Sequence, residues 1–388
     1  MTVYRIDLVP MERFFFGGEN TFGVDNKDNY FIRSVHFPQQ TTLLGTLRYL
    51  LLKYSNLMNQ NGKVINVEDA NTLIGDNGFD IANFDKGYGK IKKLSSVFIA
   101  GPDGDYVVQS QEFGLDWMED EISKKRLQGL VPLYYRPQQG RSFLASKKNS
   151  IPYLEGLNSK TLLPDLLLNL FTKQIRYLDF KPEFKLNSMN GIFIEEEQVG
   201  INKKNKENGF YKQVGFRMNE GYGFSFYAEI DQNDISILNL PIKMGADQSW
   251  FRISVIDRNN FDATKDFFFN TEKRPDVFTY PNSPSGKIVL LSDTYMEREI
   301  FNSDINFAIA RTCSFRYMET KNGIGTDKSF RNVKADFNLV KNKQNFELLK
   351  SGSVLFVDHA KKIAVLNKIK GDNDISASFH QIGYNYAI

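Results

Sequence analysis

The chain has 388 residues, 41% hydrophobic and 24% charged, an ordinary globular composition that is long enough for two or three domains. Its net charge of +3, from 49 Lys and Arg against 46 Asp and Glu, permits a polyanionic partner without demonstrating one. The single cysteine, Cys313, excludes an internal disulfide and a multi-thiolate metal site, and it fits a reducing cytoplasm.

The sequence carries no sign of membrane insertion or export. No run approaches the roughly 18 apolar residues that a spanning helix needs. The N-terminal MTVYRIDLVPMERFFF lacks a charged leader followed by an apolar stretch, so we expect no signal peptide. We therefore expect a soluble, cytoplasmic protein without membrane contact.

The N-terminal elements are a strand, a long loop and a helix. Residues 3–9 alternate loosely and end at Pro10, as a strand does. A polar, Gly-rich loop is expected from Gly17 to Phe37. TTLLGTLRYLLLKYS (residues 41–55) then gives the best helix signal, with Thr41 or Thr42 as its cap.

That helix is amphipathic, and helical spacing places five apolar residues on one face: Leu43, Leu47, Leu50, Leu51 and Tyr54. Gly45 and Arg48 lie away from this face. A strand, a long loop and a capped helix form the opening of a ferredoxin-like βαββαβ unit.

The middle of the chain is less regular. A short helix is expected near residues 67–74, and an amphipathic helix over residues 162–177. SSVFIAGPDGDYVV (95–108) predicts a hairpin turning at Asp103-Gly104. Further strands are expected at residues 191–201, 209–218, 224–230 and 249–256.

A second block follows RPDVFTYPNSPSG (274–286), whose Pro, Ser and Asn content marks a linker. The block is about the size of one more ferredoxin-like unit. We therefore expect an α+β protein of two ferredoxin-like (RRM-like) domains. Their expected bounds are 1–258 with an insertion at about 57–185, a linker at 259–284, and 285–388.

FPQQTTLLGTLRYLLL (37–52) resembles a motif of the third subunit of the type III-B CRISPR (Cmr) complex, in which a Phe-Pro turn precedes Leu-Leu-Gly-x-Leu-Arg. Other segments resemble that family in the expected order, from an N-terminal strand with its Phe-Phe loop to SGSVLFV near the C-terminus. KMGADQSWFRISV (243–255) stands where the family has a Gly-Gly-Glu loop. Each segment alone is a weak signal, but the ordered set is specific.

The resemblance implies a non-catalytic RAMP subunit that binds the 5′ tag of the guide RNA (crRNA) in antiviral defence. The implied partners are the guide RNA, the large polymerase-cyclase subunit and the backbone RAMP subunit, with one copy of this chain in the hetero-oligomer. It implies no cofactor and no metal.

The expected RNA contacts surround the start of the first helix. Free N–H groups and the positive dipole end at Thr41 and Thr42 suit a phosphate. His36 can stack on unpaired bases, and Arg33 can stack or pair with phosphate. The full predicted set is Arg33, His36, Gln39, Gln40, Thr41, Thr42, Arg48, Gly245 and Gln248. The alternatives are an ordinary capped helix with a solvated Arg48, and a loop that packs Phe37 inward.

The same loop offers aromatic residues for a partner. Phe22, Tyr30 and Phe31 lie in a Gly-rich segment, which suits interface anchors. The alternative is that these side chains fold back onto the first helix.

Two other functions remain open. A RAMP endonuclease that processes CRISPR precursor RNA needs a base and a second acid or cation, and His36 with Arg33 are the candidates. A purely structural assembly subunit needs no RNA contact. His36, His359 and His380 show no metal-ligand spacing, and the consecutive Glu195, Glu196 and Glu197 suit a solvated strand edge.

Overall fold

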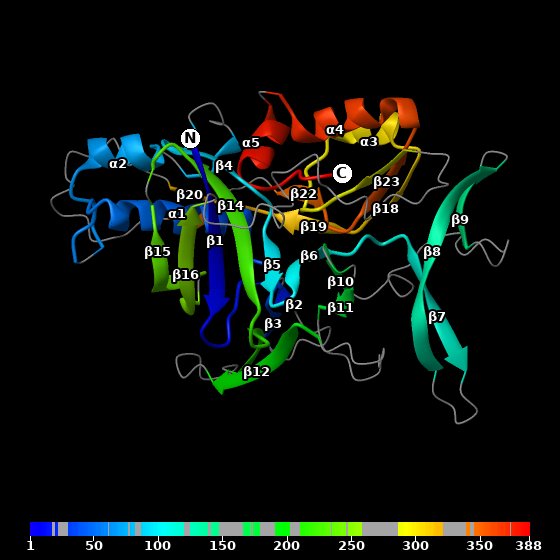
Figure 1. Ribbon diagram of the computed structural model, residues 1–388, viewed down its shortest axis with the longest axis horizontal. Coiled ribbons are helices and arrows are strands. Elements are labelled where there is room, and N and C mark those ends of the chain that lie inside the picture. Colours follow the sequence, from blue (N-terminus) through cyan, green and yellow to red (C-terminus); the bar gives the residue numbers. More distant parts are fainter. Residues whose placement is uncertain are drawn as a thin grey trace.

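The computed structural model describes residues 1–17, 20–21, 30–60, 62–76, 78–81, 87–119, 125–138, 141–146, 166–170, 172, 174–178, 191–201, 210–233, 235–245, 247–257, 286–320, 339–341, 345–372 and 374–388. Over these residues the fold is mixed α+β, and its sheets are mostly antiparallel (Figure 1). This confirms the expected class.

The largest sheet has nine strands, eight of them in the order β11-β10-β6-β5-β14-β1-β16-β15, with β4 also pairing with β14. In chain order its members are β1 (Thr2–Pro10), β4 (Ile91–Leu94), β5 (Phe98–Gly101), β6 (Gly104–Val108), β10 (Leu166–Asn169), β11 (Ile175–Tyr177), β14 (Gly223–Ile230), β15 (Ile237–Met244) and β16 (Ser249–Asp257).

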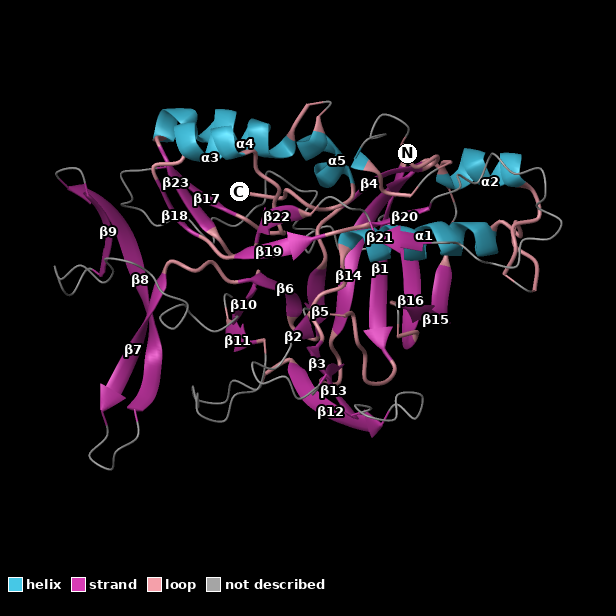
Figure 2. Ribbon diagram, turned by 180° about the vertical axis from the view of Figure 1, so that it is seen from behind, coloured by secondary structure: helices cyan, strands magenta, loops and turns pink. Residues whose placement is uncertain are grey.

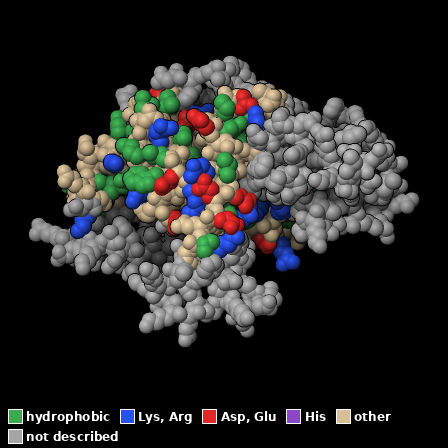
Figure 3. Space-filling model, turned by 90° about the horizontal axis from the view of Figure 1, so that it is seen from below, with side chains coloured by type: hydrophobic (Ala, Val, Ile, Leu, Met, Phe, Trp, Pro, Cys, Tyr) green, Lys and Arg blue, Asp and Glu red, His purple; other side chains and the backbone are tan. Residues whose placement is uncertain are grey.

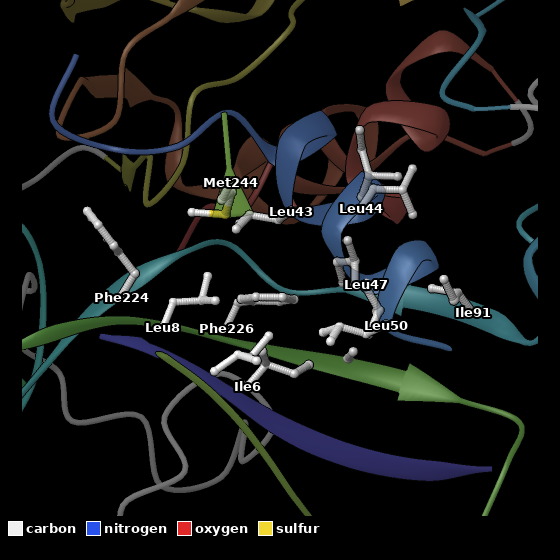
Figure 4. Close-up of a cluster of buried hydrophobic side chains, with 14 of the residues drawn as sticks. Ile6, Leu8, Leu43, Leu44, Leu47, Leu50, Ile91, Phe224, Phe226 and Met244 are labelled. Atoms are coloured by element: carbon white, nitrogen blue, oxygen red, sulfur yellow. The ribbon is translucent and has the colours of Figure 1, made fainter. Parts of the chain in front are cut away.

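One face of this sheet packs on helix α1 (Gln40–Tyr54) (Figure 4). The alternation of β1 buries Tyr4, Ile6 and Leu8 completely. The expected helix face is buried at all four of its leucines, each worth roughly 1.5–3 kcal/mol on removal from water. Its fifth member does not fit, because Tyr54 is 42% exposed where the last turn of the helix passes beyond the sheet.

β1, α1 and β5 form a split βαβ unit. β1 and β5 both pair antiparallel with β14, so they run in the same direction on either side of it. β16 then pairs antiparallel with the other edge of β1. In the described part of the β14–β16 connection there is a strand, β15, where a βαββαβ unit has its second helix.

The C-terminal residues build a second unit of this kind. Its central strand is β23 (Val354–Val357), which pairs antiparallel with β17 (Gly286–Val289) on one side and with β18 (Phe307–Ile309) on the other. Helix α3 (Arg298–Asp304) connects β17 to β18 along the chain. Helices α4 (Lys362–Lys370) and α5 (Ile375–Gln381) follow, and Ala387 then bridges antiparallel to Leu290 beside β17. Figure 2 shows α3, α4 and α5 along one side of this unit.

The two units share their core. Phe379 of α5 is fully buried, and its ring lies 5.4 Å from both Phe79 of the N-terminal half and Phe315 of the C-terminal half. The expected linker, residues 259–284, lies outside the described residues. The apolar core therefore runs across the two blocks that the sequence distinguishes.

A four-stranded sheet of order β12-β13-β3-β2 lies against the end of the main sheet. It contains β2 (Asn20–Thr21), β3 (Tyr30–Arg33), β12 (Phe193–Ile201) and β13 (Phe210–Met218). β3 runs parallel to β13. The segment expected as a loop from Gly17 to Phe37 thus contains two short strands, because β13 offers it a free edge.

The remaining elements are α2 (Val67–Ile74), a 3-10 helix (His359–Lys361), and three small antiparallel sheets. Their strands are β7 (Phe113–Glu119), β8 (Lys125–Gln138), β9 (Arg141–Ser146), β19 (Thr312–Phe315), β20 (Met318–Thr320), β21 (Leu339–Lys341) and β22 (Phe346–Leu349). The β7-β8-β9 ribbon extends away from the body (Figure 1).

The predicted hairpin within residues 95–108 is confirmed, with its turn at Pro102-Asp103, one residue before the expected Asp103-Gly104. The predicted helix over residues 162–177 is wrong. Its described part forms strands β10 and β11, with Leu167 and Leu168 pairing with β6. A short buried apolar run suits a helix and an interior strand equally, so periodicity alone could not decide. Five strands of the nine-stranded sheet come from the expected insertion, residues 57–185.

The predicted cap of α1 is also wrong. The helix begins at Gln40, one residue before the predicted stretch of residues 41–55. Its N-cap is the extended Gln39, which makes no side-chain cap hydrogen bond. Gln40 is already in the helix because its side chain is 3% exposed and bound on both sides by the core. No helix in the described part of the chain is long and apolar enough to span a membrane.

Candidate nucleic-acid interface

Three segments far apart in the sequence meet where β13 passes the end of the main sheet. They are residues 13–17, residues 33–39 and the β15–β16 turn at Gly245, Asp247 and Gln248. We call this meeting point the loop junction. Five of the nine predicted contacts lie in it by sequence, namely Arg33, His36, Gln39, Gly245 and Gln248.

Backbone hydrogen bonds fix the first two segments of the loop junction. The N–H of Ser34 donates to Val214 of β13 (2.8 Å), and the N–H of Val35 donates to Gly17 (2.8 Å). The hydroxyl of Ser34 accepts the N–H of Phe16 (2.9 Å). Gly17 has a φ of +82°, which a residue with a Cβ rarely adopts. The loop is therefore tied to β13 rather than free.

The turn between β15 and β16 packs on the same segment. The N–H of Gln248 donates to Gly245 (3.2 Å), and both residues have positive φ values, +57° and +78°. A Cβ added to Gly245 would meet the carbonyl oxygen of Phe15 at 3.4 Å. The β15–β16 turn is thus tightly formed beside the Phe-rich segment.

Arg13 links the first segment to β12 and β13 and, through Gln213, to the β15–β16 turn. It donates to Gln198 of β12 and to Gln213 of β13, both at 2.8 Å, and Gln213 donates to the Asp247 carboxylate at 3.1 Å. Its aliphatic and guanidinium atoms lie over Gly215, where a Cβ would come within 2.5 Å of Nε. Its Nε is buried without an acceptor.

Two of the predicted RNA-contacting side chains, His36 and Arg33, lie against the ring of Phe216. The His36 ring stacks on it with centroids 4.3 Å apart and an interplanar angle of 26°. The Arg33 guanidinium lies 5.7 Å from the same ring and pairs with Glu195 of β12. The structure therefore brings Arg33 and His36 together on one aromatic platform.

The first turn of α1 points its open end toward this loop. Gln39 accepts the N–H groups of Thr42 (2.9 Å) and Leu43 (3.2 Å). Within the described residues no acceptor binds the N–H groups of Gln40 and Thr41. These N–H groups carry the positive end of the helix dipole, which favours an anion.

Two predicted contacts are engaged elsewhere. Arg48 donates from Nε to Ile74 and from Nη2 to Gly75, both at 3.1 Å, at the C-terminal end of α2. Burial lowers its pKa from the ordinary value. The Gln40 amide bridges Val97 N–H (2.9 Å) and the Ile382 carbonyl (3.1 Å). Both side chains therefore bond within the fold.

Phe37 packs inward against Phe193 and Phe224, as its alternative reading predicted. The expected partner-interface residues Tyr30 and Phe31 lie on β3, paired with Tyr211 and Lys212 of β13. Phe22 lies outside the described residues.

The β12–β13–β3 sheet balances its charges by itself. Glu195 pairs with Arg33, Glu196 with Arg217 (2.8 Å) and Glu197 with Lys212 (2.7 Å). The three glutamates lie on the edge strand β12 with partly exposed side chains, as expected of a solvated edge, and each pairs with a cation. Figure 3 shows Lys and Arg intermixed with Asp and Glu near the middle of the described surface from below.

Sequence reasoning did not select Arg13, Gln213, Asp247 or Phe216. The segment holding Arg13 was among the resemblance motifs, and that was the available signal. The part of the chain with described positions holds no cluster of three or more His, Cys, Asp or Glu side chains suited to a metal.

No protein-family model matches the chain, and no curated protein matches it either. Among solved structures it is similar to subunits of type III CRISPR complexes. One is a chain in a cryo-EM structure of the type III-B Cmr-beta complex bound to cognate target RNA, at 15% identity and a TM-score of 0.46, covering 99% of this chain and 96% of that one.

A second structure of Cmr-beta, with target RNA and AMPPnP, gives 14% identity and a TM-score of 0.44 over 99% and 96% of the two chains. The crystal structure of a Csm3–Csm4 subcomplex of the type III-A interference complex gives 12% and 0.32 over 92% and 94%.

Proposed function

We propose that this chain is a non-catalytic RNA-binding subunit of a type III-B CRISPR effector complex, where it anchors the 5′ tag of the guide RNA in antiviral defence. The ordered family motifs support this, above all FPQQTTLLGTLRYLLL. We take the two split βαβ units as the two ferredoxin-like domains that the resemblance implies. The large polymerase-cyclase subunit and the backbone RAMP subunit are its proposed neighbours, with one copy of this chain in a cytoplasmic complex.

The observation that carries the proposal is the convergence at the loop junction. Arg33 and His36 lie together over Phe216, in the segment that leads into the open first turn of α1. Cationic side chains and free N–H groups hold phosphates, and planar side chains stack on unpaired bases. A single-stranded tag needs both kinds of contact.

The same geometry favours binding over cleavage. Cutting RNA by attack of a 2′-OH needs a base that can take its proton and a second group for the leaving oxygen. The His36 ring lies flat on Phe216, and the Arg33 guanidinium pairs with Glu195. Both side chains are arranged as positioned contacts on a platform, which suits a ligand that is held.

The proposal is tested by incubating the full chain with guide RNA that carries the tag, and with precursor repeat RNA. Tight binding to the tag with both RNAs left intact is the expected result. Specific cuts in the repeat that disappear in His36→Ala would establish the endonuclease instead. If the chain binds neither RNA but still joins the complex, the purely structural subunit is correct.

A further inference from the structure

Trp250 is an exposed aromatic residue on the outer face of the main sheet. Its side chain on β16 is 40% exposed. Lys243 lies opposite it on β15, and its Nζ is 5.0 Å from the Trp250 ring centroid. The face of the sheet that packs on α1 is the opposite one, because the buried Phe251 and Ile253 alternate with the exposed Trp250 and Arg252.

Two cations of this face, Lys243 and Arg252, make no ion pair within the described residues, whereas Arg5 further across the face pairs with Asp7 and Asp105. Arg252 follows Trp250 on the same side of β16, roughly 6.6 Å further along the strand. In the described part of the chain no carboxylate pairs with Lys243 or Arg252, unlike the three cations paired with glutamates on β12 and β13. Glu12 accepts the backbone N–H of Trp250 (3.3 Å). The patch therefore favours an anionic occupant.

The edge beside this face is closed to strand addition. β15 is the last strand of the sheet, and it holds Pro241 and a bulge at Asn239, whose φ is +55°. Both features block pairing with another strand. A second copy or a partner strand thus has no edge to extend, and the open face remains as the binding surface.

The patch continues directly from the loop junction. Gln248 of the β15–β16 turn is two residues from Trp250, and the N–H of Met11, which is 57% exposed, donates to the Trp250 carbonyl (3.0 Å). Trp250 stands on a strand paired on both sides, so its ring is held by a rigid scaffold.

We infer that Trp250, Lys243 and Arg252 form a stacking platform for an unpaired RNA base, extending the binding path beyond the loop junction. An exposed aromatic ring between unpaired cations is the arrangement by which proteins hold single-stranded nucleic acid without reading its sequence. The base stacks on the indole, and Lys243 and Arg252 bind the flanking phosphates. The inference rests on the proposed function, because it presumes that RNA reaches the loop junction.

The test uses Trp250 as its own reporter. The sequence has two tryptophans, and Trp117→Phe leaves Trp250 as the only one. This variant is titrated with single-stranded tag RNA, with the same sequence as a duplex, and with heparin as a polyanion without bases. We expect strong fluorescence quenching by the single strand and little by the other two.

Affinity gives a second readout. Trp250→Ala should weaken single-strand binding between about 5-fold and about 150-fold, the range for one stacked base, while Trp250→Phe keeps most of it. Melting temperatures show whether each variant is folded, and the fluorescence readout needs no variant at Trp250. Lys243→Gln should weaken single-strand binding and heparin binding together.

Two failures are distinguishable. In the first, the single strand binds and Arg33→Ala weakens that binding, but Trp250 fluorescence is not quenched and Trp250→Ala binds like the parent protein. The platform is then wrong, and the proposed function stands. If no RNA binds at all, both are wrong. Quenching by an acidic protein partner but not by RNA would overturn the inference in favour of a protein-docking face.

Discussion

Arg33 reaches across β13, over the ring of Phe216, to form an ion pair with Glu195 on β12. Both side chains are partly exposed, at 43% and 38%. An RNA phosphate that binds Arg33 must therefore compete with a carboxylate of the protein itself. The pair sets the orientation of the guanidinium and lowers its net attraction for RNA.

Removing the competing charge should strengthen RNA binding. Glu195→Gln is expected to raise tag RNA affinity by about 1.5-fold to 5-fold, the value of an exposed ion pair. The gain should vanish in the Arg33→Ala background, which a double-variant cycle in a binding titration measures. An equal gain in both backgrounds would show that Glu195 acts through general charge and not through Arg33.

Arg48 should matter for stability more than for RNA. Arg48→Ala removes two hydrogen bonds from a charged donor to the end of α2, so we expect a loss of about 1.5–3 kcal/mol in unfolding free energy. Chemical denaturation measures this loss, with Lys53→Ala on the same helix as the exposed control. A stable Arg48→Ala protein with weakened RNA binding would restore Arg48 to the interface.

His380 should make the protein acid-sensitive. Burial, aided by Lys93 and Lys370, lowers its pKa to about 3, and its Nε2 lies 3.0 Å from Lys93 Nζ. The unfolded chain, with the ordinary pKa of about 6.5, binds this proton first, so stability falls as pH drops from about 6.5 toward 3.

One such histidine contributes a loss of about 2 kcal/mol at pH 5 relative to pH 8. Denaturant melts at several pH values measure it. His380→Gln should flatten the profile, whereas His359→Gln, at an exposed position, should not. An unchanged slope in His380→Gln would assign the acid sensitivity to other groups.

The partner interface is tested on β3. Tyr30→Ala with Phe31→Ala keeps the backbone pairing with β13, so we expect a nearly unchanged melting temperature. Pull-down of the large polymerase-cyclase subunit should weaken, because aromatic anchors dominate interfaces. A large drop in melting temperature with intact pull-down would mean that both side chains serve the fold.

The strongly periodic elements were predictable from sequence. β1 and α1 bury the alternating and helical positions that the pattern selects, and the hairpin between β5 and β6 follows from the Pro, Asp and Gly residues at its turn. The run at Leu166–Leu168 was not predictable, because a strand and a helix bury such a run equally well. The start of α1 was also missed, since a tertiary contact of Gln40 fixes it.

The site was predictable only in part, and distance along the chain explains why. Arg33 and His36 lie in a motif next to the first helix, where local reasoning finds them. Arg13 and Gln213 are 200 residues apart, and they meet through the register of β13, which no local pattern encodes. Arg48 is the opposite case. Local reasoning selected it as an RNA contact, but its guanidinium donates a hydrogen bond to Ile74 within the fold.

The central claim, that the loop junction binds the tag, is tested most directly by the salt dependence of RNA affinity in two matched variants. Arg33 and Arg217 are both exposed arginines paired with β12 glutamates, and the strand register places them on opposite faces of the sheet. Each lost phosphate contact lowers the log–log slope by about 0.7 for a single strand. We predict this decrease for Arg33→Ala and none for Arg217→Ala. Equal slopes in both variants and the parent protein would contradict the claim.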